Sequence, residues 1–290
     1  EGSRVVSFDP IWCCMLENIL PFSESYEKLK LVPFIEQEGK LDVDFEALER
    51  RLSKADILYL NNPHNPTGKV FSMEELTEIN ELCLRHNVTI VSDEAYRDIV
   101  FDKKRHVSML EFPGDHIISV FTFSKTFAAT GYRIGYTVVR NKKYIPMLTR
   151  VEYTQTAGVV TPNQHGFKVA LENVEERDKW ISYMVSKLQN RRDIMHEGIE
   201  RIFGRDVYKP QGAFYQWLDL NPWMKGIPVE KRDEFLLEKL FENGIAVVPG
   251  RYFSKRRYKG CVRLSYSMID GDRASEGVER MGKVLNDLHH

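Results

Sequence analysis

A lysine and an arginine, eight residues apart, are the two side chains of this sequence that suggest chemistry together. Lys125 lies between hydroxyl residues in Phe123-Ser124-Lys125-Thr126, and Arg133 follows it beside glycines. A lysine amine can form an imine with an aldehyde cofactor, and an arginine can bind a phosphate through its planar fork of donors. Together they predict a site that holds pyridoxal phosphate (PLP) covalently. Either residue alone is more often a solvated surface side chain, so the prediction depends on the elements around them.

Apolar segments of strand length alternate with amphipathic segments around this pair. Four of them have strand character, at residues 57–60, 88–91, 117–121 and 134–139. After the first, Ser72 and Glu75 have the spacing of a capping box that begins a helix. Strands that alternate with helices predict an α/β fold, here a three-layer αβα domain with a mainly parallel sheet.

Polar residues follow the carboxyl ends of three of the predicted strands. They are Asn65, Asp93 and Lys125. Ligands of such sheets gather beyond the carboxyl ends of the strands. We therefore expect these three side chains to lie at one edge of the sheet.

Four motifs resemble those of the PLP-dependent aminotransferases of class I/II, the aspartate aminotransferase-like family of fold type I. The motifs are Asn65-Pro66-Thr67-Gly68, Asp93-Glu94-Ala95-Tyr96, Ser124-Lys125 with Arg133, and Val262-Arg263-Leu264-Ser265. Their order and approximate spacing match the family over nearly the whole chain. The resemblance implies an enzyme that moves an amino group from an amino acid to a 2-oxo acid in two half-reactions.

The resemblance also implies a role for each candidate residue. Lys125 would hold PLP as a Schiff base and move the substrate proton, and Asp93 would pair with the ring nitrogen of PLP. Asn65 and Tyr96 would hydrogen-bond its phenolic oxygen. Relatives often hold the bond between Asn65 and Pro66 cis, and we expect the same here. The other candidates would bind the phosphate (Arg133, helped by Thr122 or Ser124), stack on the ring (Trp12) or bind the substrate α-carboxylate (Arg263).

Each candidate also has an ordinary structural explanation. Asp93 could cap a helix, Tyr96 could be a core tyrosine, and Asn65 could be a turn residue. Trp12 fits a core position equally well, and Arg263 could brace a strand. Three further residues could meet an acidic substrate side chain, although surface positions fit them at least as well: Arg150, Tyr153 and Arg251.

Composition excludes several classes of function. The chain has 290 residues, 42% of them hydrophobic, and a formal net charge of −1, so it can bury a sizeable core and gives no reason to expect nucleic acid as a partner. No apolar segment is long enough to cross a membrane. The four cysteines lack metal-ligand spacing, so we expect no metal site and reduced thiols in a cytoplasmic protein: Cys13, Cys14, Cys83 and Cys261.

The second half of the sequence predicts a smaller α+β domain. A long amphipathic helix is expected from Thr161-Pro162 to Gly204, and strands are expected at residues 213–219 and 245–248. We expect residues 1–175 to form the large PLP-binding domain and residues 176–290 the small one. The long helix would join them, and the active site would lie in the cleft between them.

The start of the chain departs from the family's pattern. Residues 1–8 correspond to the middle of the family's large domain, so we expect its N-terminal segment, with a phosphate-binding turn, to be absent and PLP to be retained weakly. The resemblance implies a homodimer. A PLP-dependent β-lyase and a non-catalytic or truncated PLP-fold protein stay open as alternatives, and the sequence does not identify the amino donor.

Overall fold

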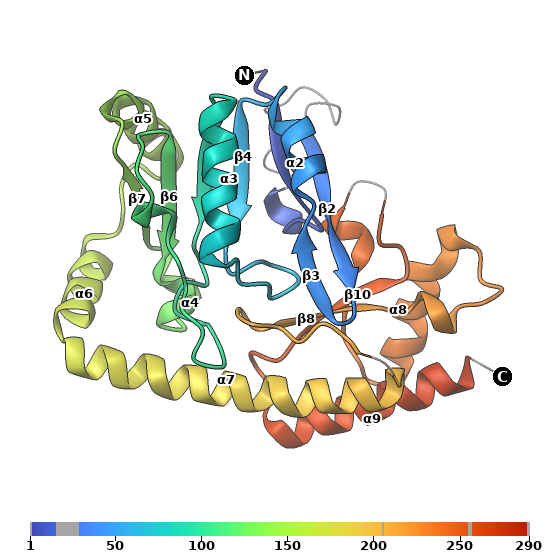
Figure 1. Ribbon diagram of the computed structural model, residues 1–290. Coiled ribbons are helices and arrows are strands. Elements are labelled where there is room, and N and C mark those ends of the chain that lie inside the picture. The colour runs from blue at the N-terminus through green and yellow to red at the C-terminus, as the bar shows by residue number, and fades with distance from the viewer. Residues whose placement is uncertain (1, 16–28, 205, 255–256, 289–290) are drawn as a thin grey trace.

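A seven-stranded sheet forms the centre of the larger part of the molecule (Figure 1). The computed structural model describes residues 2–15, 29–204, 206–254 and 257–288. Five strands, β2, β1, β4, β5 and β6, run parallel, and β3 and β7 pair antiparallel at the two edges. The mainly parallel α/β fold predicted from the sequence is confirmed. The strands are β1 (Val5–Asp9), β2 (Leu29–Gln37), β3 (Lys40–Val43), β4 (Ile57–Asn61), β5 (Thr89–Asp93), β6 (Ile117–Thr122) and β7 (Gly135–Val139).

Helices α2 (Phe45–Leu52) and α3 (Met73–Arg85) cover one face of this sheet. The predicted capping box begins α3, since Ser72 N–H donates to the Glu75 carboxylate at 2.9 Å and Glu75 N–H donates to Ser72 Oγ at 3.2 Å. Apolar side chains of both helices and of the central strands are buried together, among them Leu48, Leu58, Leu76, Ile79 and Ile90. This packing fixes the strands whose carboxyl ends deliver the polar residues.

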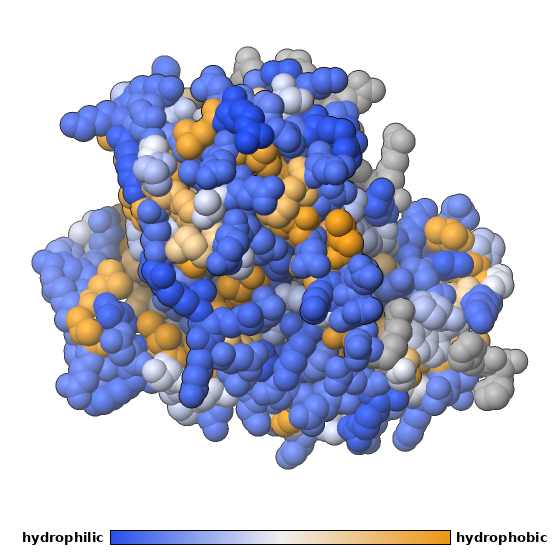
Figure 2. Space-filling model, in the orientation of Figure 1, coloured by the Kyte–Doolittle hydropathy of each residue, from blue (hydrophilic) through white to orange (hydrophobic). Residues whose placement is uncertain are grey.

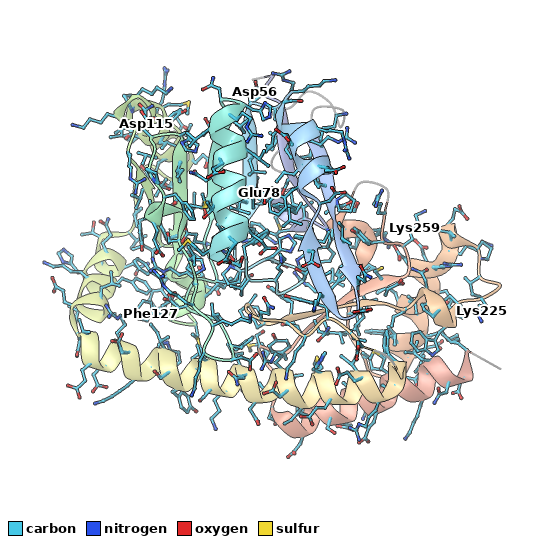
Figure 3. All side chains as sticks on the ribbon, viewed as in Figure 1. Asp56, Glu78, Asp115, Phe127, Lys225 and Lys259 are labelled. Atoms are coloured by element: carbon cyan, nitrogen blue, oxygen red, sulfur yellow. The ribbon has the colours of Figure 1, made fainter. Side chains whose placement is uncertain are left out.

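A second, antiparallel sheet of three strands lies at the carboxyl edge of the first, in the order β8-β10-β9. It consists of β8 (Tyr215–Asp219), β9 (Val248–Pro249) and β10 (Cys261–Ser265), and α8 (Arg232–Glu242) and α9 (Gly271–Asp287) pack around it. The strand predicted at residues 245–248 corresponds to β9, which begins only at Val248 and has two residues. Side chains from both sheets fill the space above the long helix α7 (Val174–Phe203) (Figure 3).

The long helix predicted from residue 161 is two helices. The first, α6 (Thr161–Glu172), ends at Asn173, whose ψ of 73° leaves the helical region, and α7 begins at the next residue. Gly204 ends α7 in the left-handed conformation, with φ of 59°, as the sequence predicted. The larger part also contains the short helix α4 (Phe123–Thr126) and α5 (Ile145–Thr156).

Specific bonds hold the two sheets together. Ile11 N–H donates to Phe253 C=O at 2.7 Å, and Tyr258 O–H donates to Asp9 C=O at 3.0 Å. These bonds join the chain at and just after the carboxyl end of β1 to the segment that connects β9 with β10. Residues that follow β4 and β5 also meet the small sheet, since Asn65 contacts Arg263 of β10 and Tyr96 contacts Tyr215 of β8.

Candidate active site

Lys125 lies just beyond the carboxyl end of β6, in the single helical turn of α4. Thr122 begins this turn, because its hydroxyl accepts the Ser124 N–H at 3.1 Å. The Lys125 ammonium is half-buried, 5.9 Å from the centre of the Tyr96 ring and 5.8 Å from that of Phe214. It has no hydrogen bond or ion pair with any residue that the structure describes.

The electrostatic surroundings of Lys125 favour its neutral amine. Burial lowers its pKa, the positive charges of Arg133 and Arg263 lower it further, and the charge of Asp93 opposes them. A lysine with a lowered pKa holds more of the neutral form that attacks a carbonyl. Lys125 therefore suits a covalent link to an aldehyde.

Asp93 occupies the corresponding position at the end of β5. Its Oδ1 accepts the Ala95 N–H at 3.1 Å, and its Oδ2 accepts the hydroxyl of Tyr59 at 2.5 Å. Burial raises the pKa of Asp93, and these hydrogen bonds oppose the rise. A turn rather than a helix follows Asp93, so the helix-cap alternative does not describe it.

Asn65 and Arg263 come together from the two sheets. Arg263, in the middle of β10, donates from Nη1 to Asn65 Oδ1 at 3.0 Å, and its guanidinium lies 4.2 Å from the ring centre of Tyr215. The Nε of Arg263 is buried without a hydrogen-bond partner among the described atoms. The peptide bond between Asn65 and Pro66 is cis, as expected. Arg263 thus presents an unused donor in a buried site between the sheets.

Tyr96 is joined to a residue that the sequence did not single out. Its hydroxyl lies 2.9 Å from that of Tyr215, the first residue of β8. Burial raises the pKa of both phenols, so both are neutral near pH 7. Sequence reasoning missed Tyr59, Phe214 and Tyr215. The one available signal for the last two was their place at the start of the strand predicted at residues 213–219.

The remaining candidates follow β6 and β1. The Thr122 hydroxyl donates to Ser124 Oγ at 2.9 Å, and Arg133 donates to Thr130 C=O at 2.9 Å from a left-handed backbone with φ of 53°. The guanidinium of Arg133 is otherwise exposed. Trp12 follows the end of β1 half-buried, and its indole contacts no ring and makes no hydrogen bond among the described residues.

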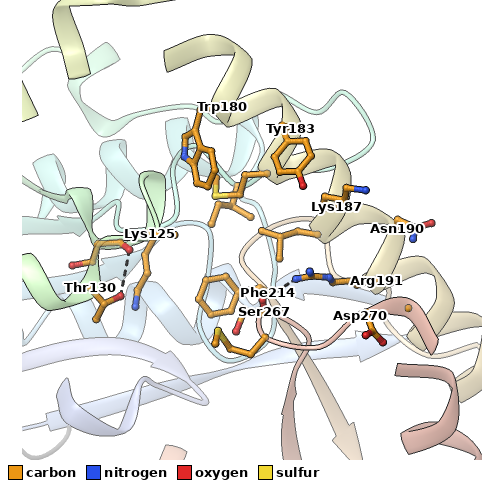
Figure 4. A pocket seen from close by; sticks show the side chains of 17 residues that line it. Lys125, Thr130, Trp180, Tyr183, Lys187, Asn190, Arg191, Phe214, Ser267 and Asp270 are labelled. Carbon is orange, nitrogen blue, oxygen red and sulfur yellow. Dashed lines mark hydrogen bonds between the residues drawn. The ribbon is translucent and has the colours of Figure 1, made fainter. Parts of the chain in front are cut away.

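A cavity of about 590 Å³ reaches Lys125 between α4 and α7 (Figure 4). Trp180, Tyr183 and Phe214 contribute its aromatic lining, and the Lys125 amine points away from the first two. Asp93, Asn65 and Tyr96 do not line this cavity. Of the three residues proposed for an acidic side chain, Arg251 pairs with Glu234, and the other two are exposed on α5: Arg150 and Tyr153.

The donor set fits PLP. An amine without an ionic partner would bind the aldehyde, a half-buried carboxylate would face the ring nitrogen, and neutral amide and phenol groups would face the phenolic oxygen. The orphaned Arg263 Nε leaves one guanidinium edge available to a carboxylate. No group of histidine, cysteine and acidic side chains suited to a metal ion occurs among the described residues.

Comparison with known proteins identifies the family. The model of the family "Aminotransferase class I and II" matches residues 1–281. The aspartate aminotransferase of Sulfurisphaera tokodaii is 34% identical over 99% of this chain and 70% of its own length. The probable aspartate/prephenate aminotransferase of Aquifex aeolicus is 33% identical over 99% of this chain and 71% of its own. These names do not support the lyase alternative.

Solved structures show the same likeness. A double mutant of Thermus thermophilus aspartate aminotransferase has a TM-score of 0.86 at 30% identity, over 98% of this chain and 70% of that one. The aromatic aminotransferase of Pyrococcus horikoshii also has a TM-score of 0.86, at 28% identity, over 99% of this chain and 74% of that one. With motif, fold and site geometry in agreement, the chain belongs to the class I and II aminotransferases and is a PLP-dependent aminotransferase.

Proposed function

We propose that Lys125 is the catalytic lysine of this aminotransferase. The observation that carries the proposal is its amine, half-buried beyond the end of β6, without an ionic partner and with a pKa lowered by burial, Arg133 and Arg263. The neutral amine would hold PLP through the cofactor's aldehyde group. Once released by an amino acid substrate, Lys125 Nζ would serve as the base that carries the substrate Cα proton.

The other residues orient and polarise the reacting groups. When bound, PLP supplies an electron sink that stabilises the charge left at the substrate Cα. Asp93 would hold a proton at the ring nitrogen, and Asn65 and Tyr96 would donate hydrogen bonds to the phenolic oxygen. Arg133, Thr122 and Ser124 would bind the phosphate, and Trp12 would stack on the ring.

We assign the α-carboxylate of the substrate to Arg263. The assignment is supported by its guanidinium, held by Asn65 through one nitrogen and left with an unpaired Nε. A bidentate arginine–carboxylate pair fixes the orientation of the substrate as well as adding affinity. We propose aspartate as the amino donor and a 2-oxo acid as the acceptor, because relatives at 34% and 30% identity are named aspartate aminotransferases.

We further propose that the enzyme acts as a homodimer in the cytoplasm and that its domains meet near residue 175, where α7 begins. Figure 2 shows apolar side chains among polar ones at the left edge, where α6 and the start of α7 lie. An interface that covers such side chains would support a dimer. The exposed apolar residues of α5 and α6 include Met147, Val151, Tyr153, Val169 and Leu171.

Within the described residues, no helix is long and apolar enough to span a membrane.

The test is turnover with a panel of amino donors and 2-oxoglutarate. The protein loaded with PLP should form glutamate and the matching 2-oxo acid, fastest with aspartate. Lys125→Ala should abolish turnover, whereas Lys187→Ala removes another lysine that lines the same cavity and should keep it. Equal loss in both variants, or full activity in Lys125→Ala, would refute the assignment.

A further inference from the structure

The hydroxyl of Tyr59 makes the shortest contact to Asp93, and its position follows from the register of two strands. Within β4 and β5, Tyr59 lies opposite Val91, and Asn61 lies opposite Asp93. Tyr59 is therefore two residues below the level of Asp93 and on the same face of the sheet, a separation of about 6.6 Å along a strand. The phenol spans this height and places its oxygen 2.5 Å from Asp93 Oδ2.

Packing leaves the Tyr59 ring little freedom. Its residue is 3% exposed and belongs to a buried cluster with Val5, Ile11 and Leu29. Burial and the charge of Asp93 raise the pKa of the phenol well above its usual range. Tyr59 is therefore a neutral donor at any physiological pH, and Asp93 is its acceptor.

Two charged groups around Asp93 have opposite effects on its pKa. Lys125, from α4, favours the carboxylate, and Glu94, the next residue in its own loop, disfavours it. The hydrogen bonds from Tyr59 and Ala95 favour the carboxylate against the opposing effect of burial. Tyr59 is the side chain with the strongest hydrogen-bonding influence on this charge.

We propose that Tyr59 is a positioning residue of the cofactor site, which holds the Asp93 carboxylate charged and oriented toward the ring nitrogen of PLP. This inference rests on the proposed role of Asp93. A carboxylate that already accepts a short hydrogen bond has a lower affinity for a further proton. The proton shared between Asp93 and the ring nitrogen therefore stays on the nitrogen, where it makes the ring a stronger electron sink.

The test is Tyr59→Phe, which removes the hydroxyl and keeps the ring in its packing. In the cofactor-free protein, carboxyl ¹³C NMR should show the pKa of Asp93 rising by about one to two units, as expected for losing one hydrogen bond to a charged group. In the loaded protein, the ¹⁵N resonance of labelled PLP should move toward the unprotonated position. The matched control is Tyr208→Phe, which removes a buried hydroxyl without a described hydrogen-bond partner and should change neither signal.

Two results would overturn the proposal. If the pKa of Asp93 is the same in Tyr59→Phe as in the unaltered protein, the hydrogen bond does not set its charge. If that pKa rises and the ¹⁵N signal stays in place, Asp93 does not face the ring nitrogen, and this failure leaves the covalent role of Lys125 standing.

A measurement on the unaltered protein covers the case in which Tyr59→Phe does not fold. The Tyr59 hydroxyl proton should resonate downfield of other buried phenol protons and should disappear in Asp93→Ala. The absence of this resonance in the unaltered protein would overturn the proposal.

Discussion

Arg263→Lys separates a substrate-binding arginine from one that merely braces the small sheet. The substitution keeps the positive charge and removes the planar fork, so it is not conservative at a bidentate site. Lysine cannot reproduce both the Nη1 bond to Asn65 at 3.0 Å and the free Nε beside it. It also loses the stacking of the guanidinium 4.2 Å from the centre of the Tyr215 ring.

The expected loss in kcat/KM follows from the buried position of this group. Truncating one partner of a buried, hydrogen-bonded charge pair costs about 2–4 kcal/mol, which is about 30- to 1,000-fold in kcat/KM. The loss should affect every amino donor, because all share the α-carboxylate. The covalent link at Lys125 should still form, since Arg263 does not touch the aldehyde in the proposed arrangement.

The assay is the initial rate of 2-oxo acid formation over a range of amino acid concentrations, combined with thermal unfolding. The control is Arg192→Lys, because Arg192 is fully buried and binds Asp102 through two bonds of 2.6 and 2.8 Å. That variant should lower Tm and leave kcat/KM nearly unchanged. If Arg263→Lys behaves as Arg192→Lys does, Arg263 only braces the fold and the reasoning is refuted.

Three further predictions each concern a single substitution. Arg133→Gln should raise the pKa of Lys125, because the charge of Arg133 lowers it. The probe is pyridoxal, which lacks the phosphate, and the pH at which it attaches to the protein at half its maximal rate should move upward. An unchanged midpoint would show that Arg133 does not act on the amine. Lys125→Met should raise the Tm of the cofactor-free protein at pH 7, because the folded state disfavours the protonated amine, and the gain should shrink as pH rises from the lowered pKa toward the ordinary value of 10.5. Gly68→Ala should lower the free energy of unfolding by at least about 2 kcal/mol, because two costs add. Alanine would have to adopt the left-handed φ of +74°, and its Cβ would lie 2.6 Å from Pro210. Gly277→Ala, in open space on α9, is its control.

Local features of the fold and site could be predicted from the sequence. The capping box of α3 depends on residues three apart, and the strand positions depend on short apolar segments. Asn65, Asp93 and Lys125 could be placed at one edge because each follows a parallel strand. The resemblance supplied Arg263, which contacts Asn65 across 198 residues of chain.

Features that depend on register or on contacts between distant segments could not be predicted. The bond from Tyr59 to Asp93 requires the alignment of β4 with β5, and no spacing within either strand encodes it. The contact of Tyr96 with Tyr215 joins residues 119 apart. The break at Asn173 was missed because apolar residues continue on both sides of it, so their pattern predicts one helix where the structure has two.

The covalent attachment of PLP tests the central claim most directly. The protein is incubated with PLP, reduced with borohydride, digested and mapped by mass spectrometry. We expect a visible absorbance band before reduction and a label on Lys125 alone, because its lowered pKa leaves more neutral amine than exposed lysines have. A label spread over surface lysines such as Lys187, with Lys125 unmodified, would contradict the account.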